Sequence, residues 1–131
     1  MRQTRRKHNK PGKITIPDGV SIYPHELIVA EILSRTGYDV TFIPVGITST
    51  PDIKYRGLFW EIKSPIGSSS RTLENNIRAA ARQSHNIIID LHRIKLPEEK
   101  CTNVIKRRAK NLGKSYRLLI ITKSREIVEL F

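Results

Sequence analysis

The sequence predicts an α/β fold with a mixed β-sheet flanked by helices. Three segments carry apolar residues at helical spacing, and short runs rich in β-branched and aromatic residues indicate strands between and after them. The order is helix, three strands, helix, strand, helix and two strands, which is typical of an α/β sandwich around a mixed sheet. A chain of 131 residues with 38% hydrophobic content is the size of one ordinary domain with one modest core.

The first helix is expected to begin at Pro24 and to end before Gly37. Proline suits the first position of a helix, and glycine suits the position after its end. The apolar stripe of this helix consists of Ile28, Val29, Ile32 and Leu33. Glu26 lies at the edge of that stripe, whereas Glu31 lies on the opposite side and is expected to be solvated. The two glutamates are therefore not equivalent.

Three strands are expected next. Residues 39–45 form the first, which Pro44 ends, and residues 52–55 and 58–64 form two more around Arg56-Gly57. These last two strands are close enough in sequence to form a hairpin.

The second half of the chain alternates between helix and strand. A helix is expected over residues 71–84, followed at 86–91 by a continuous apolar run typical of a strand buried on both faces. Residues 98–114 indicate a basic amphipathic helix with a stop at Gly113. Two closing strands are expected over 116–122 and 126–131.

The net charge of +12 indicates a polyanionic partner. Nucleic acid is the expected partner, ahead of an anionic membrane or an acidic protein. Residues 1–20 are expected to form a basic, flexible N-terminal arm, and residues 21–131 a single domain. The sequence contains no secretory signal peptide and no apolar run of the roughly 20 residues that a membrane helix needs. The single Cys101 rules out an intramolecular disulfide and a cysteine-based zinc cluster.

Two acidic residues are expected to lie opposite each other on the two strands of the predicted hairpin. If Arg56-Gly57 forms the loop, Asp52 lies opposite Glu61, and both point to the same face as Lys63. A longer symmetric loop keeps this pairing, whereas a three-residue loop breaks it. Two like charges in these positions destabilise the hairpin, so we expect a divalent cation to compensate them, with help from Lys63.

This arrangement suits phosphodiester hydrolysis. Asp52 and Glu61, with a backbone carbonyl, offer hard oxygen ligands for Mg²⁺ or Mn²⁺ in preference to Zn²⁺, and Glu26 is a further candidate ligand. Lys63 is a candidate for orienting the attacking water or stabilising the phosphate in the transition state. The alternative is structural: Asp52 caps a strand end, and Glu61 pairs with Lys54 or Lys63 on a solvated face.

The hairpin resembles the PD-(D/E)xK nuclease superfamily, with Pro51-Asp52 as the first half of the motif and Glu61-Ile62-Lys63 as the second. A wider stretch, from about His25 to Arg93, includes "HELIVAEIL", "PDIKYRGLFWEIKSP" and "SRTLENNIRAAARQSHNIIIDLHR". It is similar to the C-terminal toxin domains of contact-dependent growth inhibition proteins, and most similar to those that cut tRNA.

The resemblance implies a restriction-endonuclease-like core and a metal-dependent nuclease toxin that acts in the cytoplasm of a target cell. It also implies a cognate immunity protein as partner. The active-site candidates that it implies are Glu26, Asp52, Glu61 and Lys63.

Further polar residues are candidates for supporting roles. Gln83 is expected to bond a phosphate or a metal-bound water, or alternatively to be a satisfied amide against the sheet. Asn76 lies seven residues earlier on the same stripe, and the Ser64 hydroxyl is expected either to touch a phosphate or to shape the turn before Pro65. The candidate phosphate contacts, with a solvated face as the alternative for the first three, are Arg71, Arg78, Arg82, Lys106, Arg107 and Arg108.

Three functions follow from these observations. The first is a metal-dependent endoribonuclease acting on tRNA, the second is a DNA endonuclease with the same active site, and the third is a basic nucleic-acid-binding module without catalytic activity. Cleavage that depends on Lys63 separates the first two from the third.

Overall fold

A computed structural model describes residues 2–3, 10–46 and 51–130 of the chain. The helices are α1 (Pro24–Ser34), α2 (Ser70–Gln83) and α3 (Glu98–Leu112). The strands are β1 (Arg2–Gln3), β2 (Ile14–Thr15), β3 (Val40–Phe42), β4 (Ile53–Tyr55), β5 (Leu58–Lys63), β6 (Asn86–Asp90), β7 (Arg117–Ile121) and β8 (Ile127–Glu129). They form one sheet in the order β1-β8-β7-β6-β5-β4-β3-β2. Because β5, β6 and β7 are parallel neighbours and the β4–β5 and β7–β8 pairs are antiparallel, the predicted mixed α/β sheet is confirmed.

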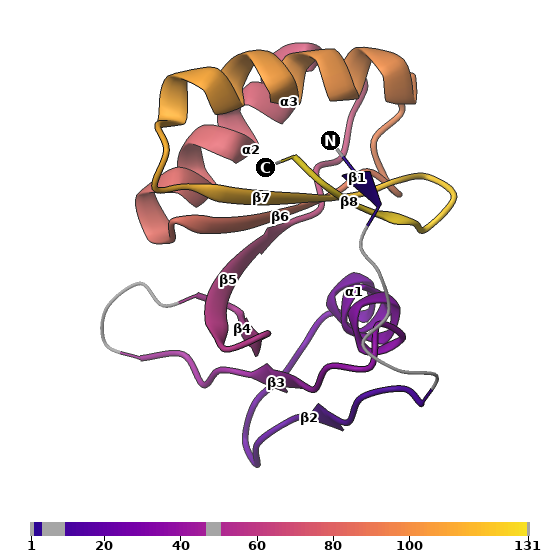
Figure 1. Cartoon of the computed structure of the whole chain (residues 1–131), viewed down its shortest axis with the longest axis vertical. Helices are drawn as coiled ribbons and strands as arrows, with labels where there is room; N and C mark the ends of the chain where they lie inside the picture. The colour runs from indigo at the N-terminus through magenta and orange to yellow at the C-terminus, as the bar shows by residue number, and fades with distance from the viewer. Residues whose placement is uncertain (1, 4–9, 47–50, 131) are drawn as a thin grey trace.

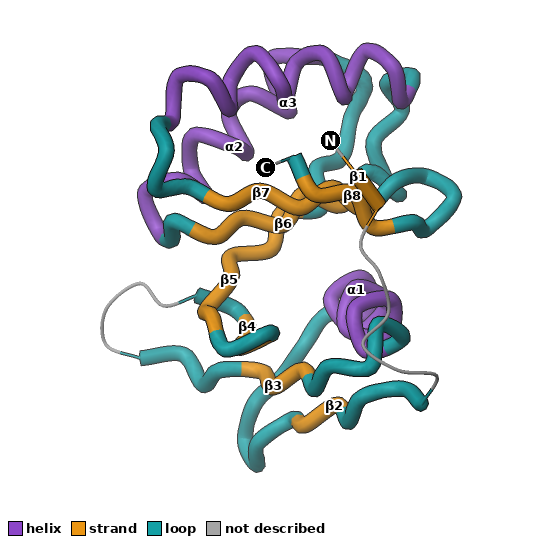
Figure 2. Tube along the Cα trace, in the orientation of Figure 1, coloured by secondary structure: helices purple, strands orange, loops and turns teal. Residues whose placement is uncertain are grey.

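The helices lie on both faces of this sheet (Figure 1). One core packs α1 against β3, β4 and β5, and includes Val29, Leu33, Phe42, Ile53 and Trp60. The other packs α2 and α3 against β6 and β7, and includes Leu73, Ile77, Ile87, Ile89 and Ile105. Figure 2 shows β5 running between the two halves of the sheet, where it pairs with β4 on one side and β6 on the other.

The start of α1 and the end of α3 follow the predicted proline and glycine signals, whereas α1 ends at Ser34 with Arg35 as its C-cap, before the predicted Gly37. Proline stands in the first turn of α1, and the Ser69 side chain caps α2 by accepting a hydrogen bond from the Thr72 N–H at 3.2 Å. Gly113 follows α3 at φ 100°, a left-handed value that glycine adopts without strain. No helix within the described ranges is long and apolar enough to cross a membrane.

The β4–β5 hairpin has the predicted two-residue turn. Arg56 and Gly57 have φ values of 56° and 74°, as a type I′ turn requires. Ile53 therefore pairs with Trp60, and Tyr55 with Leu58, which confirms the predicted register.

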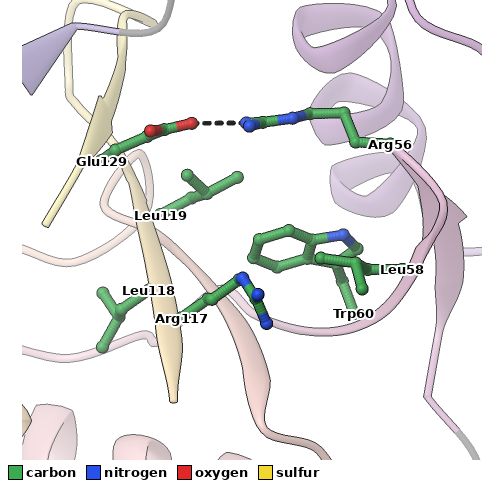
Figure 3. A pocket seen from close by; sticks show the side chains of 7 residues that line it. All are labelled: Arg56, Leu58, Trp60, Arg117, Leu118, Leu119 and Glu129. Carbon is green, nitrogen blue, oxygen red and sulfur yellow. Dashed lines mark hydrogen bonds and ion pairs between the residues drawn. The ribbon is translucent and has the colours of Figure 1, made fainter. Parts of the chain in front are cut away.

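Arg56 also connects the hairpin to β8, a strand near the opposite end of the sheet (Figure 3). Its guanidinium forms an ion pair with Glu129 of β8 and lies 5.9 Å from the ring centroids of Tyr38 and Tyr55. These contacts offset the strain of a non-glycine residue at positive φ. A pocket of about 130 Å³ beside the ion pair is lined by Arg56, Leu58, Trp60, Arg117, Leu118, Leu119 and Glu129.

Alternation along β5 decides which side chains face α2. Trp60 and Ile62 are buried in the core that contains α1. Because successive residues of a strand point to opposite faces, Glu61 and Lys63 point to the face that α2 covers. The Arg56–Glu129 pocket, which Trp60 lines, is therefore separate from Glu61 and Lys63.

The N-terminal segment departs from the expectation of a basic arm over residues 1–20. In its described part, β2 pairs in parallel with β3, and β1 pairs with β8. The Gly12 N–H donates to the Ser34 carbonyl at 2.7 Å, and Ile14 packs against the α1-side core. The many basic residues of the segment favoured the expectation of an arm, although Ile14 is an apolar residue that packs on the domain. Residues 4–9 of the expected arm lie outside the described residues.

Gly12→Ala is expected to destabilise the domain by about 1–3 kcal/mol. A Cβ atom at this position would lie 1.9 Å from the Tyr38 carbonyl oxygen, so the segment would have to move away from the backbone of Tyr38 and Asp39. Thermal unfolding followed by circular dichroism measures the effect. The control is Asp18→Ala, which changes an exposed side chain of the same segment. Equal melting temperatures for the two variants would contradict the packing of residues 10–20 on the domain.

Candidate active site

Asp52 and Glu61 lie side by side, just past the paired part of the hairpin. The Asp52 N–H donates to the Trp60 carbonyl at 2.9 Å, and its Oδ2 accepts a hydrogen bond from the Ile62 N–H at 2.7 Å. Asp52 is therefore held against β5 on both sides of Glu61, through its backbone N–H at Trp60 and through its carboxylate at Ile62. The structure brings the two acids together as the register predicted.

Burial and mutual repulsion disfavour the charged forms of this pair. Glu61 is only 4% exposed, and burial followed by the Asp52 charge raises the pKa of Glu61 to about 7, against the opposing effect of Lys63. Burial also raises the pKa of Asp52, against the hydrogen bond from Ile62, and the charge of Glu26 adds to that rise. Neutralising either carboxylate, by a proton or by a cation, would therefore relieve this repulsion.

Two donors from different elements contact Glu61. The Lys63 ammonium lies 3.3 Å from Glu61 Oε2. The Gln83 side-chain amide, with its nitrogen turned toward Glu61, donates to Oε2 at 2.7 Å and to Oε1 at 3.0 Å. Gln83 is the last residue of α2, so the packing of this helix on the sheet places its amide at the acid pair. Lys63 thus lies next to the acids, as strand alternation predicted, and Gln83 is a satisfied amide whose partner is Glu61.

Glu26 is close to the acid pair, but its side chain caps the N-terminus of α1. It lies in the first turn of α1, where its Oε1 accepts a hydrogen bond from the Tyr23 N–H at 2.8 Å. The negative charge of Glu26 contributes to the raised pKa of Asp52. Among the described residues, no group of three or more His, Cys, Asp or Glu is placed to hold a metal ion.

The donor set of the pair fits a hard divalent cation. Asp52 and Glu61 present carboxylate oxygens, and neither histidine nor cysteine joins them in the described part of the chain. Oxygen ligands suit Mg²⁺ and Mn²⁺, whereas zinc sites usually include nitrogen or sulfur. A cation at this position would offset the like charges of the pair.

Ser64 and Asn76 make hydrogen bonds away from the acid pair. The Asn76 amide donates to the Thr72 carbonyl of its own helix at 2.8 Å. The Ser64 hydroxyl donates to Asp90 Oδ2 at 3.1 Å. Within the described residues, the hydrogen bonds of these two side chains are therefore to Asp90 and to the α2 backbone, and their contacts with phosphate stay predictions.

Asp90 is a residue that the sequence reasoning missed. It is 2% exposed at the end of β6, and besides Ser64 it accepts a hydrogen bond from the His92 N–H at 3.1 Å. Arg93 donates to the Ser64 carbonyl at 2.6 Å. Together these groups hold the backbone that follows Lys63. An acid that ends an apolar strand, as in "NIIID", was the available signal.

The six basic candidates differ in their surroundings. Arg107 and Arg108 pair with Glu74 at 2.8 and 2.6 Å, which joins α3 to α2. Arg78 and Arg82 are exposed and line a groove of about 230 Å³ between these helices. The remaining candidates, Arg71 and Lys106, are exposed. The arginine pair on α3 is thus partly neutralised, which the charge pattern alone did not indicate.

Comparisons with known proteins place this geometry in context. Residues 49–127 match the family model described as the contact-dependent growth inhibition CdiA C-terminal domain. This range contains the acid pair, Lys63 and Gln83, whereas Glu26 precedes it. No curated protein sequence gives a significant match.

A solved structure, described as the CdiA-CT/CdiI toxin and immunity complex from Burkholderia pseudomallei, has a similar fold. Its TM-score is 0.66 at 19% sequence identity, and the alignment covers 91% of this chain and 98% of that chain. At this identity the likeness concerns the fold alone.

Proposed function

The chain belongs to the contact-dependent growth inhibition CdiA C-terminal domain family, and we propose that it is a toxin domain with metal-dependent endoribonuclease activity. Its substrate is tRNA in the cytoplasm of a target cell. The observation that carries this proposal is the Asp52–Glu61 pair, of which Glu61 is buried, with Lys63 and Gln83 around it. An acid pair and a lysine on a hairpin, with an α-helix against them, also fit the PD-(D/E)xK superfamily.

Each residue of the site has a distinct role in this proposal. Asp52 and Glu61 hold the divalent cation, which when bound lowers the pKa of a water ligand and neutralises charge on the phosphate. Gln83 fixes the orientation of the Glu61 carboxylate through its two hydrogen bonds. The Lys63 ammonium orients the attacking water or stabilises the additional negative charge on the phosphate. Glu26 assists through its charge near Asp52.

The proposed protein partner is a cognate immunity protein. The similar fold from Burkholderia pseudomallei was solved in a toxin and immunity complex, which supports this class of partner. The net charge of +12 favours an acidic binding surface on such a protein.

The decisive experiment offers the purified protein two substrates. Total tRNA and plasmid DNA are incubated separately with Mg²⁺, Mn²⁺ or EDTA, and Lys63→Ala serves as the inactive control. The proposal expects discrete tRNA fragments that disappear in EDTA and with Lys63→Ala. Intact tRNA beside nicked plasmid would favour a DNA endonuclease, and no cleavage with either metal would favour a binding module.

Gln83→Leu is expected to lower the tRNA cleavage rate about 10- to 100-fold, the usual effect of losing a group that orients a metal ligand. The substitution keeps side-chain bulk at the end of α2 but removes both hydrogen bonds to Glu61. The control is Asn76→Ala on the same helix, because the Asn76 amide bonds only its own backbone in the interactions described above. Single-turnover cleavage rates measure the effect. Equal losses for the two variants would mean that α2 acts only through its packing.

A further inference from the structure

Phe59 places an aromatic ring beside the acid pair. It precedes Glu61 by two residues in β5, so the two side chains share a face, roughly 7 Å apart along the strand. Phe59 is 49% exposed, whereas Trp60, which points to the other face, is 2% exposed. An exposed ring in the middle of a sheet, next to a candidate active site, is available to a ligand.

The backbone of Phe59 is held rigidly. Its carbonyl accepts hydrogen bonds from Ser84 Oγ at 3.1 Å and from Asn86 Nδ2 at 2.9 Å. Both donors lie at the junction of α2 and β6, directly after Gln83. The same junction therefore anchors the backbone that carries the ring and follows the amide that contacts Glu61.

Lys54 adds a positive charge at the ring. It is the cross-strand partner of Phe59, it is exposed, and its Nζ lies 5.9 Å from the ring centroid. An exposed cation–π contact of this length contributes about 0.5–1 kcal/mol. Stacking of a nucleic-acid base on an aromatic ring contributes about 1–3 kcal/mol. A base can therefore displace the ammonium from the ring and leave it close to the adjoining phosphate.

We propose that Phe59 and Lys54 form a nucleotide subsite, in which an unpaired RNA base stacks on the ring and the ammonium contacts its phosphate. This inference rests on the proposed endoribonuclease function and adds a substrate class to it. Bases inside a duplex are stacked on their neighbours and present no free face to the ring. The RNA segment that enters the site is therefore single-stranded, as in a loop or at an unpaired end.

Binding in EDTA tests the subsite without cleavage. The probes are a fluorescein-labelled single-stranded oligoribonucleotide of mixed sequence and the same strand annealed to its complement, followed by fluorescence anisotropy. Phe59→Ala is expected to weaken binding of the single strand about 5- to 150-fold and to change duplex binding less than about twofold. Phe59→Trp is expected to keep the wild-type affinity. Lys54→Ala is expected to reduce the salt dependence of binding by about one charge.

Two further variants separate stacking from general effects. Phe59→Leu keeps an apolar side chain on β5 and is expected to bind the single strand as weakly as Phe59→Ala. Ile66→Ala changes another exposed apolar side chain, 61% exposed outside the sheet, and is expected to bind like the wild type. Wild-type affinity for Phe59→Leu, or equal losses on single strand and duplex, would overturn the subsite.

Failure of the proposed subsite can be distinguished from failure of the proposed endoribonuclease function. A wild-type protein that cleaves tRNA while Phe59→Ala binds single strands normally overturns the subsite alone. A wild-type protein that binds single strands through Phe59 but never cleaves them overturns the endoribonuclease alone.

Discussion

Glu61→Gln is expected to lower RNA cleavage by about a thousandfold or more and at the same time to raise thermal stability at pH 8. The loss of activity follows from the removal of one of two carboxylates proposed to hold the cation. The gain in stability follows from the raised pKa of Glu61, which burial and Asp52 bring to about 7. At pH 8 the folded protein must keep a buried, repelled charge that the unfolded chain solvates freely.

The glutamine can keep the contacts made by one of the two oxygens of Glu61. Its carbonyl oxygen accepts from Lys63 and Gln83, and its amide can donate to the Asp52 carboxylate. A shift from 4.5 to about 7 corresponds to at most about 3 kcal/mol, so we expect a gain of about 1–2 kcal/mol, or roughly 4–8 °C in melting temperature. Calorimetry in EDTA at pH 8 measures the gain, and single-turnover cleavage of tRNA with Mg²⁺ measures the loss.

Two controls accompany this variant. At pH 4 Glu61 is largely protonated in the folded and unfolded states, so the difference in melting temperature should disappear. Glu74→Gln makes the same chemical change on α2, where the Arg107 and Arg108 guanidinium groups lower the pKa of the acid. That variant should gain no stability and should keep its activity. A less stable Glu61→Gln protein at pH 8, or one that cleaves within tenfold of the wild type, would contradict the assignment.

The parts of the site governed by local geometry were predictable from the sequence. A two-residue loop at Arg56-Gly57 fixes the hairpin register, and the register places Asp52 beside Glu61. Strand alternation then places Lys63 on the same face, and helical spacing places Gln83 at the edge of the apolar face of α2. Each of these steps involves residues fewer than about 15 positions apart, within one or two elements, whereas the contact between Gln83 and Glu61 itself depends on how α2 packs on the sheet.

The parts governed by packing between distant elements were not predictable. The pairing of Arg107 and Arg108 with Glu74 depends on how α3 settles against α2. The bond between Ser64 and Asp90 depends on how far β5 and β6 extend past each other. The attachment of residues 10–20 depends on the contact of Gly12 with the end of α1. The charge and periodicity of the sequence do not indicate these three contacts, because the contacts depend on the tertiary structure.

The effect of a divalent cation on stability is expected to depend strongly on pH. The raised pKa of Glu61 means that the metal-free protein is most stable below about pH 4.5 with respect to this group, and loses that contribution as the pH rises toward 7. A cation at the pair favours the charged carboxylates, so it restores stability mainly at the upper end of this range.

Below pH 7 the cation must displace the proton on Glu61. We therefore expect the apparent affinity for Mn²⁺ to fall about tenfold per pH unit on the acid side of this value. At pH 8, Mn²⁺ at about 100 times its Kd should stabilise the protein by about 2.7 kcal/mol, and at pH 5 the same concentration should have a much smaller effect. Thermal unfolding from pH 5 to 8.5, with Mn²⁺ or EDTA, gives the apparent affinity for Mn²⁺ and the stabilisation that it causes.

Glu61→Gln is the control for this experiment. It should flatten the pH dependence of stability in EDTA and weaken the response to Mn²⁺, since it removes both the titrating carboxyl group and the carboxylate ligand. Equal stabilisation by Mn²⁺ at pH 5 and pH 8, or a full response in Glu61→Gln, would show that the cation binds somewhere other than the acid pair.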